Sequence, residues 1–133
     1  MASRVRREDP RRYGPACATV RLAEKDGLRA LGQFVSYDAM VMHGPGDDRL
    51  SFGGIKKRAL AKARPPARGG DETRYLNAFL FLDARKAAMK AEEAHEDTSR
   101  IDTMQRVFLR RRNLDLTPPL TWKLYGDRYT ITK

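Results

Sequence analysis

Two proline pairs limit the length of the regular elements in this 133-residue chain. Proline has no backbone N–H and its ring clashes with the preceding helical turn, so Pro65-Pro66 and Pro118-Pro119 each end any helix before them. Between the pairs, residues 83–112 contain neither glycine nor proline, which allows one long helix. Thr98 or Ser99 could instead cap a second helix, so one helix and two helices both remain open.

Within this stretch, residues 84–94 have the pattern of an amphipathic helix. Alanines recur on one face, and the remaining face is expected to hold the charged residues Arg85, Lys86, Lys90, Glu92 and Glu93. Residues 73–82, just before it, are the most hydrophobic part of the chain. Periodicity does not decide between a buried strand and the first turns of a helix for a run this short.

The first third of the chain carries strand signals. Residues 16–22 are partly β-branched, Asp26-Gly27 supplies a tight turn, and residues 28–43 are rich in large apolar side chains. We therefore expect two or three antiparallel strands over 16–43 and a short strand over 50–55.

At the other end of the chain, residues 120–133 alternate around Gly126-Asp127 and predict a β-hairpin. The predicted fold class is α+β. A small antiparallel sheet, made of the N-terminal strands and the C-terminal hairpin, would pack against a long helix in the C-terminal half.

Basic residues outnumber acidic residues by 27 to 17, which gives a formal net charge of +10 and a pI near 10.2. A charge of this sign attracts phosphate backbones and acidic protein surfaces. Much of it falls in a basic N-terminal arm over 1–15 and a basic linker over 56–72. We expect both segments to be extended and partly disordered in isolation. Residues 16–133 would then form one small domain interrupted by the linker.

Three clusters of basic residues form the candidate site for a polyanion. One lies in the arm, one in the linker, and one at the end of the predicted long helix, where cations would also complement the helix dipole. Basic tracts without acids usually serve interaction. The candidate polyanion-binding residues are Arg4, Arg6, Arg7, Arg11, Arg12, Lys56, Lys57, Arg58, Lys62, Arg64, Arg68, Arg106, Arg110, Arg111 and Arg112.

Candidate catalytic and metal-binding residues are few. Cys17 is the only cysteine, His43 and His95 are the only histidines, and no catalytic or metal-site motif surrounds them. The adjacent pair Asp47-Asp48 suits a polar loop better than a cation site. The sequence therefore predicts no catalytic residue, no cofactor, no metal site and no enzymatic activity.

Part of the first third resembles an RNA-binding family. In residues 19–40 an Asp26-Gly27 turn precedes Gly32 and then Asp38, as in the first motif of Sm-like RNA-binding barrels. No asparagine follows Met40, where that motif has one, and we assign no family from the sequence.

The single cysteine excludes an internal disulfide, which suits a reducing compartment. No apolar run reaches the ~20 residues that a membrane span needs. We therefore expect an intracellular protein, cytoplasmic or organellar, that is not secreted and has no membrane contact.

Taken together, these features favour a non-enzymatic structural or accessory subunit of a large hetero-assembly. Its basic arm and linker would contact RNA in a ribonucleoprotein that resembles an organellar ribosome. A subunit lining an acidic polymer, such as the inner wall of an axonemal microtubule, is one alternative, and a phage or chromosomal DNA-binding protein is another. All three partners attract the same charges, so the sequence leaves the choice open.

Overall fold

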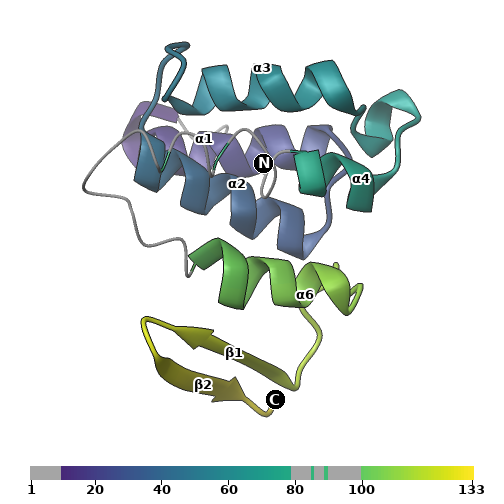
Figure 1. Ribbon diagram of the computed structural model, residues 1–133. Helices are drawn as coiled ribbons and strands as arrows, with labels where there is room; N and C mark the ends of the chain where they lie inside the picture. Colours follow the sequence, from purple (N-terminus) through teal and green to yellow (C-terminus); the bar gives the residue numbers. More distant parts are fainter. Residues whose placement is uncertain (1–9, 79–84, 86–88, 90–99) are drawn as a thin grey trace, which may run out of the picture.

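The computed structural model describes residues 10–78, 85, 89 and 100–133. Within this part, the first half of the chain is helical and the only sheet is a C-terminal hairpin (Figure 1). The arm residues 1–9 and most of the stretch over 83–99 lie outside the described residues. The choice between one and two helices over 83–112 falls largely on that stretch.

The strands expected over 16–43 are wrong, because this segment forms two helices, α1 (Pro10–Lys25) and α2 (Ala30–His43). The buried residues Leu31, Val35 and Ala39 of α2 are four apart, so they line one side of the helix. Asp26-Gly27 does form a turn, with Gly27 at φ 85°, but the turn joins two helices. The segment that resembles an Sm-like motif is therefore not part of a barrel.

The extended linker expected over 56–72 is also wrong. Residues 52–76 form helix α3 (Phe52–Lys62), the short 3-10 helix η1 (Pro66–Arg68) and helix α4 (Glu72–Leu76). Helix α3 buries Ile55 and Ala59 completely, while its basic residues lie on the outer side. The Asp71 side chain caps α4 by accepting a hydrogen bond from the Arg74 N–H at 2.9 Å.

The C-terminal part contains a π-helical segment η4 (Arg100–Gln105), helix α6 (Arg106–Arg110) and strands β1 (Leu120–Leu124) and β2 (Asp127–Ile131). The two strands pair antiparallel, with Trp122 opposite Tyr129 and Lys123 opposite Arg128. The predicted hairpin and the α+β fold class are confirmed. In the hydrophobic stretch 73–82, the described part is helical rather than extended.

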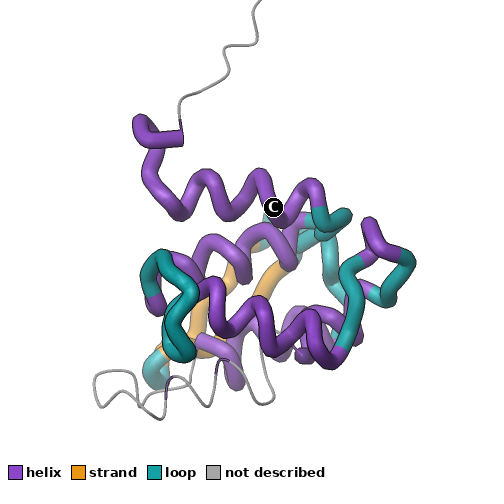
Figure 2. The backbone as a smooth tube through the Cα atoms, turned by 90° about the horizontal axis from the view of Figure 1, so that it is seen from above, coloured by secondary structure: helices purple, strands orange, loops and turns teal. Residues whose placement is uncertain are grey.

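The elements are arranged in tiers (Figure 1). Helix α3 lies above α1 and α2, helix α6 lies below them, and the hairpin with the C-terminus is at the bottom. Seen from above, the strands lie behind the helices (Figure 2). One apolar core joins the tiers, and its fully buried members include Leu31, Ile55, Leu76 and Ile101. None of the helices in the described residues is long and apolar enough to span a membrane.

Candidate functional site

Arg85 lies at the centre of a buried polar network, with 0% of its surface exposed. Its guanidinium donates from Nη2 to Asp38 Oδ2 at 3.0 Å, from Nε to His43 Nε2 at 3.1 Å and from Nη1 to Gln105 Oε1 at 3.0 Å. Gln105 Nε2 donates to the same Asp38 oxygen at 2.9 Å. Among the described residues, the permanent charge of the arginine is therefore matched by the carboxylate of Asp38 and by two oriented polar groups.

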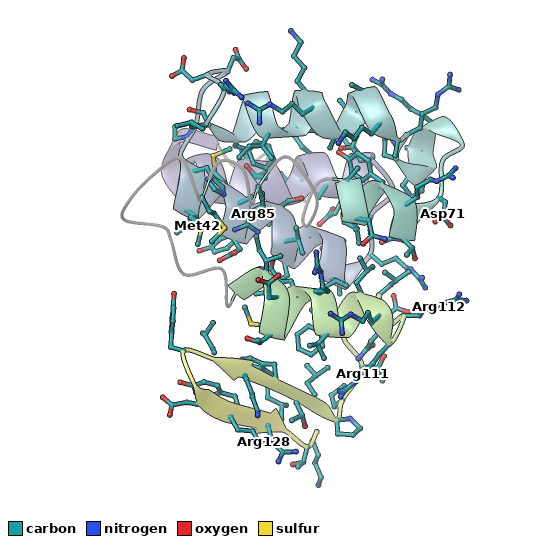
Figure 3. The ribbon with its side chains drawn as sticks, in the orientation of Figure 1. Met42, Asp71, Arg85, Arg111, Arg112 and Arg128 are labelled. Carbon is teal, nitrogen blue, oxygen red and sulfur yellow. The ribbon has the colours of Figure 1, made fainter. Side chains whose placement is uncertain are left out.

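Three parts of the chain meet at this network. The last turns of α2 supply Asp38, Met42 and His43, and η4 supplies Gln105. Arg85 Nη2 also lies 3.5 Å from Met42 Sδ, and Figure 3 shows these two side chains next to each other at the end of α2. Asp38 and Met42 are four residues apart and lie on the same side of α2, and His43 follows Met42 at the end of the helix, so this end presents all three groups.

Disrupting this network would destabilise the folded protein. A buried ion that loses its partner keeps its desolvation penalty and has nothing to offset it. Removing either Arg85 or Asp38 would take from the other its ion-pair partner at 3.0 Å inside the protein. The network therefore holds the end of α2, residue 85 and η4 in a single arrangement.

His43 connects the network to a surface loop. Because Nε2 accepts a hydrogen bond from Arg85, the geometry assigns the proton of a neutral ring to Nδ1. His43 is the last residue of α2, and the loop 44–51 follows it directly. This loop is fixed to the start of α3, since the Phe52 N–H donates to the Gly44 carbonyl at 3.0 Å and the Gly53 N–H to the Gly46 carbonyl at 2.9 Å.

The loop and α3 enclose a hollow of about 600 Å³, and its lining carries both signs of charge. One exposed carboxylate, that of Asp47, faces three basic side chains. The lining residues are Asp47, Arg49, Gly54, Lys57, Arg58 and Ala61. Asp47, in the lining of this hollow, follows His43 by four residues in the sequence.

The candidate polyanion-binding residues do not form one surface. Lys56, Lys57, Arg58 and Lys62 are on α3 and Arg68 is in η1, whereas Arg106 and Arg110 are on α6 at the other side of α2 (Figure 1). Lys56 is paired with Asp26 at 2.8 Å, and Arg106 lies 3.7 Å from Asp102. The remaining members are Arg64 before η1, Arg111 and Arg112 after α6, Arg11 and Arg12 in α1, and Arg4, Arg6 and Arg7 outside the described residues. Polyanion binding by these residues stays a prediction.

The residues considered for catalysis are also separated. Cys17 is in α1, His43 belongs to the buried network, and His95 lies outside the described residues. In the part of the chain that the structure describes, no three side chains of the metal-binding types gather at one point.

The chain belongs to glycosyl hydrolase family 46, whose model matches residues 4–120. It is 72% identical over 109 residues to the chitosanase of Streptomyces sp. strain N174, and this match covers 82% of the chain and 38% of that enzyme. The chitosanase of Nocardioides sp. strain N106 is 64% identical over 107 residues, which is 80% of the chain and 38% of that enzyme. The chain therefore spans well under half the length of these relatives.

Solved structures give the same family. A chitosanase complex superposes with a TM-score of 0.83 at 56% identity, covering 87% of this chain and 48% of the other. The chitosanase of Gynuella sunshinyii, solved with chitotetraose, superposes with a TM-score of 0.74 at 32% identity, covering 90% of this chain and 50% of the other. These likenesses cover most of this chain but only half of each chitosanase.

Family membership corrects three predictions made from the sequence. A non-enzymatic subunit is wrong, because the family consists of glycosyl hydrolases. RNA in a hetero-assembly is wrong as the partner, because the relatives are enzymes named for chitosan. An intracellular, non-secreted protein is wrong as well, since bacterial chitosanases are typically secreted. A lone cysteine carries no information here, because a chain without disulfides is compatible with either side of the membrane.

The network itself was not found from the sequence. Arg85 was expected on the solvent-exposed face of an alanine-rich helix, and that expectation is wrong. Nothing in its local pattern separates it from Lys86 or Lys90. The available signal was Asp38, an acid placed one residue before the apolar run Ala39–Met42, because an acid in an apolar segment needs a buried partner.

Proposed function

We propose that this protein acts on chitosan as a glycoside hydrolase, and that the Arg85 network forms the rigid frame behind its substrate-binding surface. The single observation that carries this proposal is the 72% identity to the Streptomyces chitosanase over 109 residues. The shared chitosanase fold, seen in neighbours solved with substrate and with chitotetraose, supports it further.

The chemistry of the proposed reaction requires two carboxyl groups on either side of the scissile bond, one of which protonates the leaving oxygen. In the described residues, Asp38 is committed to Arg85, Asp26 to Lys56, and Glu72 and Asp115 to Arg29. The hollow beside the loop has one carboxylate, that of Asp47. The described residues therefore supply at most one side of such a pair at this hollow.

The Arg85 network contributes positioning in this proposal. It fixes His43, and through His43 it fixes the start of the exposed loop 44–51. A surface that holds a polysaccharide gains affinity when it is rigid before binding, because less conformational freedom is lost. The exposed carboxylates of Asp47 and Asp48 on this loop would attract the protonated amino groups of chitosan.

A chimera tests the proposal without requiring the chain to act alone. The chain would replace the matched 109-residue segment of the Streptomyces chitosanase, and release of reducing ends from soluble chitosan would be measured. We expect the chimera to cleave chitosan, whereas the relative with its matched segment deleted should not. The chain would be assayed alone in parallel.

A chimera that folds, as judged by circular dichroism and a cooperative thermal transition, but releases no oligomers would contradict the proposal. Asp127→Asn in the hairpin serves as the matched control for Asp47→Asn. The loop variant should raise KM for chitosan, while the hairpin variant should leave it unchanged.

A further inference from the structure

A second hollow lies between the η4–α6 helix and the C-terminal hairpin, on the opposite side of α2 from α3 (Figure 1). Its volume is about 420 Å³, and one wall comes from the helix while the other comes from β1 and β2. The lining residues are Asp102, Thr103, Val107, Arg111, Thr121, Trp122, Lys123 and Arg128. The hairpin wall lies beyond residue 120, where the match to the family model ends. We call this feature the hairpin hollow.

The hairpin hollow concentrates positive charge. Lys123 and Arg128 are directly opposite each other in the strand register, and like charges in this arrangement destabilise a sheet. Arg111 joins them from the end of α6, and Figure 3 shows it above the hairpin that carries Arg128. Three cations therefore share one small space.

The acids of the described chain do not neutralise this charge. Asp102 is the only carboxylate in the lining, and it already lies 3.7 Å from Arg106. Among the described ion pairs, none involves Arg111, Lys123 or Arg128. The cross-strand repulsion would be relieved by an anion between these side chains.

In the hairpin wall, the aromatic side chain of Trp122 is held in place by its neighbours. Trp122 packs edge-on against Phe108, with ring centroids 5.9 Å apart, and stacks on Tyr129 at 5.7 Å. The Thr103 hydroxyl donates to the Lys123 carbonyl, which ties β1 to the helix. These contacts fix the distance between the hairpin and the helix, so the hollow does not depend on the ligand to form it.

We propose that the hairpin hollow binds a phosphate group between Arg111, Lys123 and Arg128. Guanidinium groups bind phosphate oxygens through two parallel N–H donors, and a lysine ammonium adds a point charge. A phosphate carries up to two negative charges, which matches three cations better than a single carboxylate does. The site is separate from the proposed chitosan surface, because it is lined by η4, α6 and the hairpin rather than by the loop 44–51 and α3.

Intrinsic fluorescence tests the proposal directly, because Trp122 is the only tryptophan in the chain. The whole protein would be titrated with inorganic phosphate, with sodium chloride added to keep the ionic strength constant. We expect a saturable change in Trp122 emission and a rise in the thermal unfolding midpoint. A titration with sodium chloride alone should give neither.

Substitutions locate the site. Arg128→Gln and Lys123→Gln should each weaken the apparent Kd for phosphate by about tenfold, as expected for loss of a charged hydrogen-bond donor. Arg49→Gln, an equal change in the hollow beside the loop, should leave the Kd unchanged. If a hairpin variant loses its native circular dichroism, Arg111→Gln on the helix side provides the same comparison. A non-saturating response, or an equal loss of affinity in Arg49→Gln, would overturn the proposal.

Discussion

Arg85 brings a permanent positive charge into a site with no solvent exposure, where it pairs with Asp38 at 3.0 Å. Replacing it with the similarly sized but neutral methionine would remove this ion pair from the protein interior. We predict that Arg85→Met lowers the free energy of unfolding by about 3–5 kcal/mol, the range found when one member of a buried ion pair is removed. Urea denaturation at neutral pH measures this loss.

The same substitution at an exposed ion pair is the control. The Arg29 side chain is 51% exposed and pairs with Glu72 and Asp115, each at 3.2 Å. Exposed pairs contribute about 0–1 kcal/mol, so Arg29→Met should cost far less than Arg85→Met. In a double-mutant cycle, Asp38→Asn combined with Arg85→Met should cost less than the sum of the two single variants. Equal losses of unfolding free energy in Arg85→Met and Arg29→Met would show that burial of Arg85 does not increase the cost of removing its charge.

Because of Tyr75, the stability of the folded protein changes with pH in the alkaline range. It is buried on α4, and its pKa is raised above the ordinary tyrosine value by burial first and by Asp26 second, with Arg68 acting in the opposite direction. Above about pH 10 the unfolded chain releases this proton while the folded protein keeps it. The folded state then binds more protons, so stability is complete below about pH 10 and falls as the pH rises further.

The measurement is a series of urea midpoints between about pH 8 and pH 11. In Tyr75→Phe, residue 75 cannot ionise in either the folded or the unfolded state, so the urea midpoint should decline less steeply with pH. Tyr129→Phe, at an exposed position in the hairpin, should leave the decline as in the unmodified protein. The comparison concerns the slopes, so a uniform loss of stability in Tyr75→Phe does not affect it. Parallel slopes in all three proteins would exclude Tyr75 as the cause.

At the scale of elements, the hairpin could be predicted and the N-terminal helices could not. The pairing partners of β1 and β2 lie within twelve residues of each other, so the alternation and the Gly126 turn were visible in one short window. In α2, the β-branched and aromatic residues suggested a strand, and the buried positions Leu31, Val35 and Ala39 were not recognised as a helical period.

Helix α3 was missed for a different reason. The six basic residues from Lys56 to Arg68, four of them in α3, suggested a solvated linker, but the apolar residues Phe52, Ile55 and Ala59 are spaced to face the core. The long aliphatic stems of lysine and arginine are compatible with a helix whose outer face is largely basic. Net charge in a segment therefore did not predict the absence of regular structure.

Helix α3 also contains a glycine whose role can be tested. A Cβ on Gly54 would clash with the backbone carbonyl of Asp48, where the loop approaches the helix. We predict that Gly54→Ala destabilises the protein by about 1–3 kcal/mol, because the loop must move. Thermal or urea unfolding measures the change.

Helix propensity alone would give the opposite sign, since alanine is favoured over glycine in a helix by about 1 kcal/mol. Ala61→Gly, the reverse substitution at an exposed position of the same helix, separates the two effects. If the clash with the Asp48 carbonyl outweighs helix propensity, both variants lose stability. A gain in Gly54→Ala with a loss in Ala61→Gly would show that propensity decides and that the loop has room to adjust.

For the whole molecule, the fold class could be predicted, whereas the activity could not. The side chains of the Arg85 network are up to 67 residues apart in the sequence, so no local sequence motif predicts that they meet. Charge pointed to an anionic partner, but the family relatives act on a polymer of amino sugars. A net charge describes the average surface, and one small region of opposite charge is enough to bind a cationic ligand.

That contrast between a basic protein and a cationic polymer leads to a prediction that rests on the proposed function. Chitosan and a chain of formal charge +10 repel each other at long range. Raising sodium chloride from about 10 mM to about 150 mM shortens the screening distance from ~30 Å to ~8 Å. The association rate of a glucosamine hexamer with the protein should therefore rise about threefold or more over this range, which is opposite to the behaviour of a protein that binds a polyanion.

Substitutions on the outer surface test whether the whole field is the cause. Arg64 and Arg68 are exposed basic residues, Arg64 just before η1 and Arg68 within it, and neither lines the hollow beside the loop. Changing both to glutamine should raise the association rate at low salt and flatten its salt dependence. The matched control, Arg64→Lys with Arg68→Lys, preserves charge and should behave as the unmodified protein does. Stopped-flow binding at several salt concentrations measures both effects. An association rate that falls with salt would mean that local carboxylates near the bound sugar, such as those of Asp47 and Asp48, outweigh the net charge of the molecule.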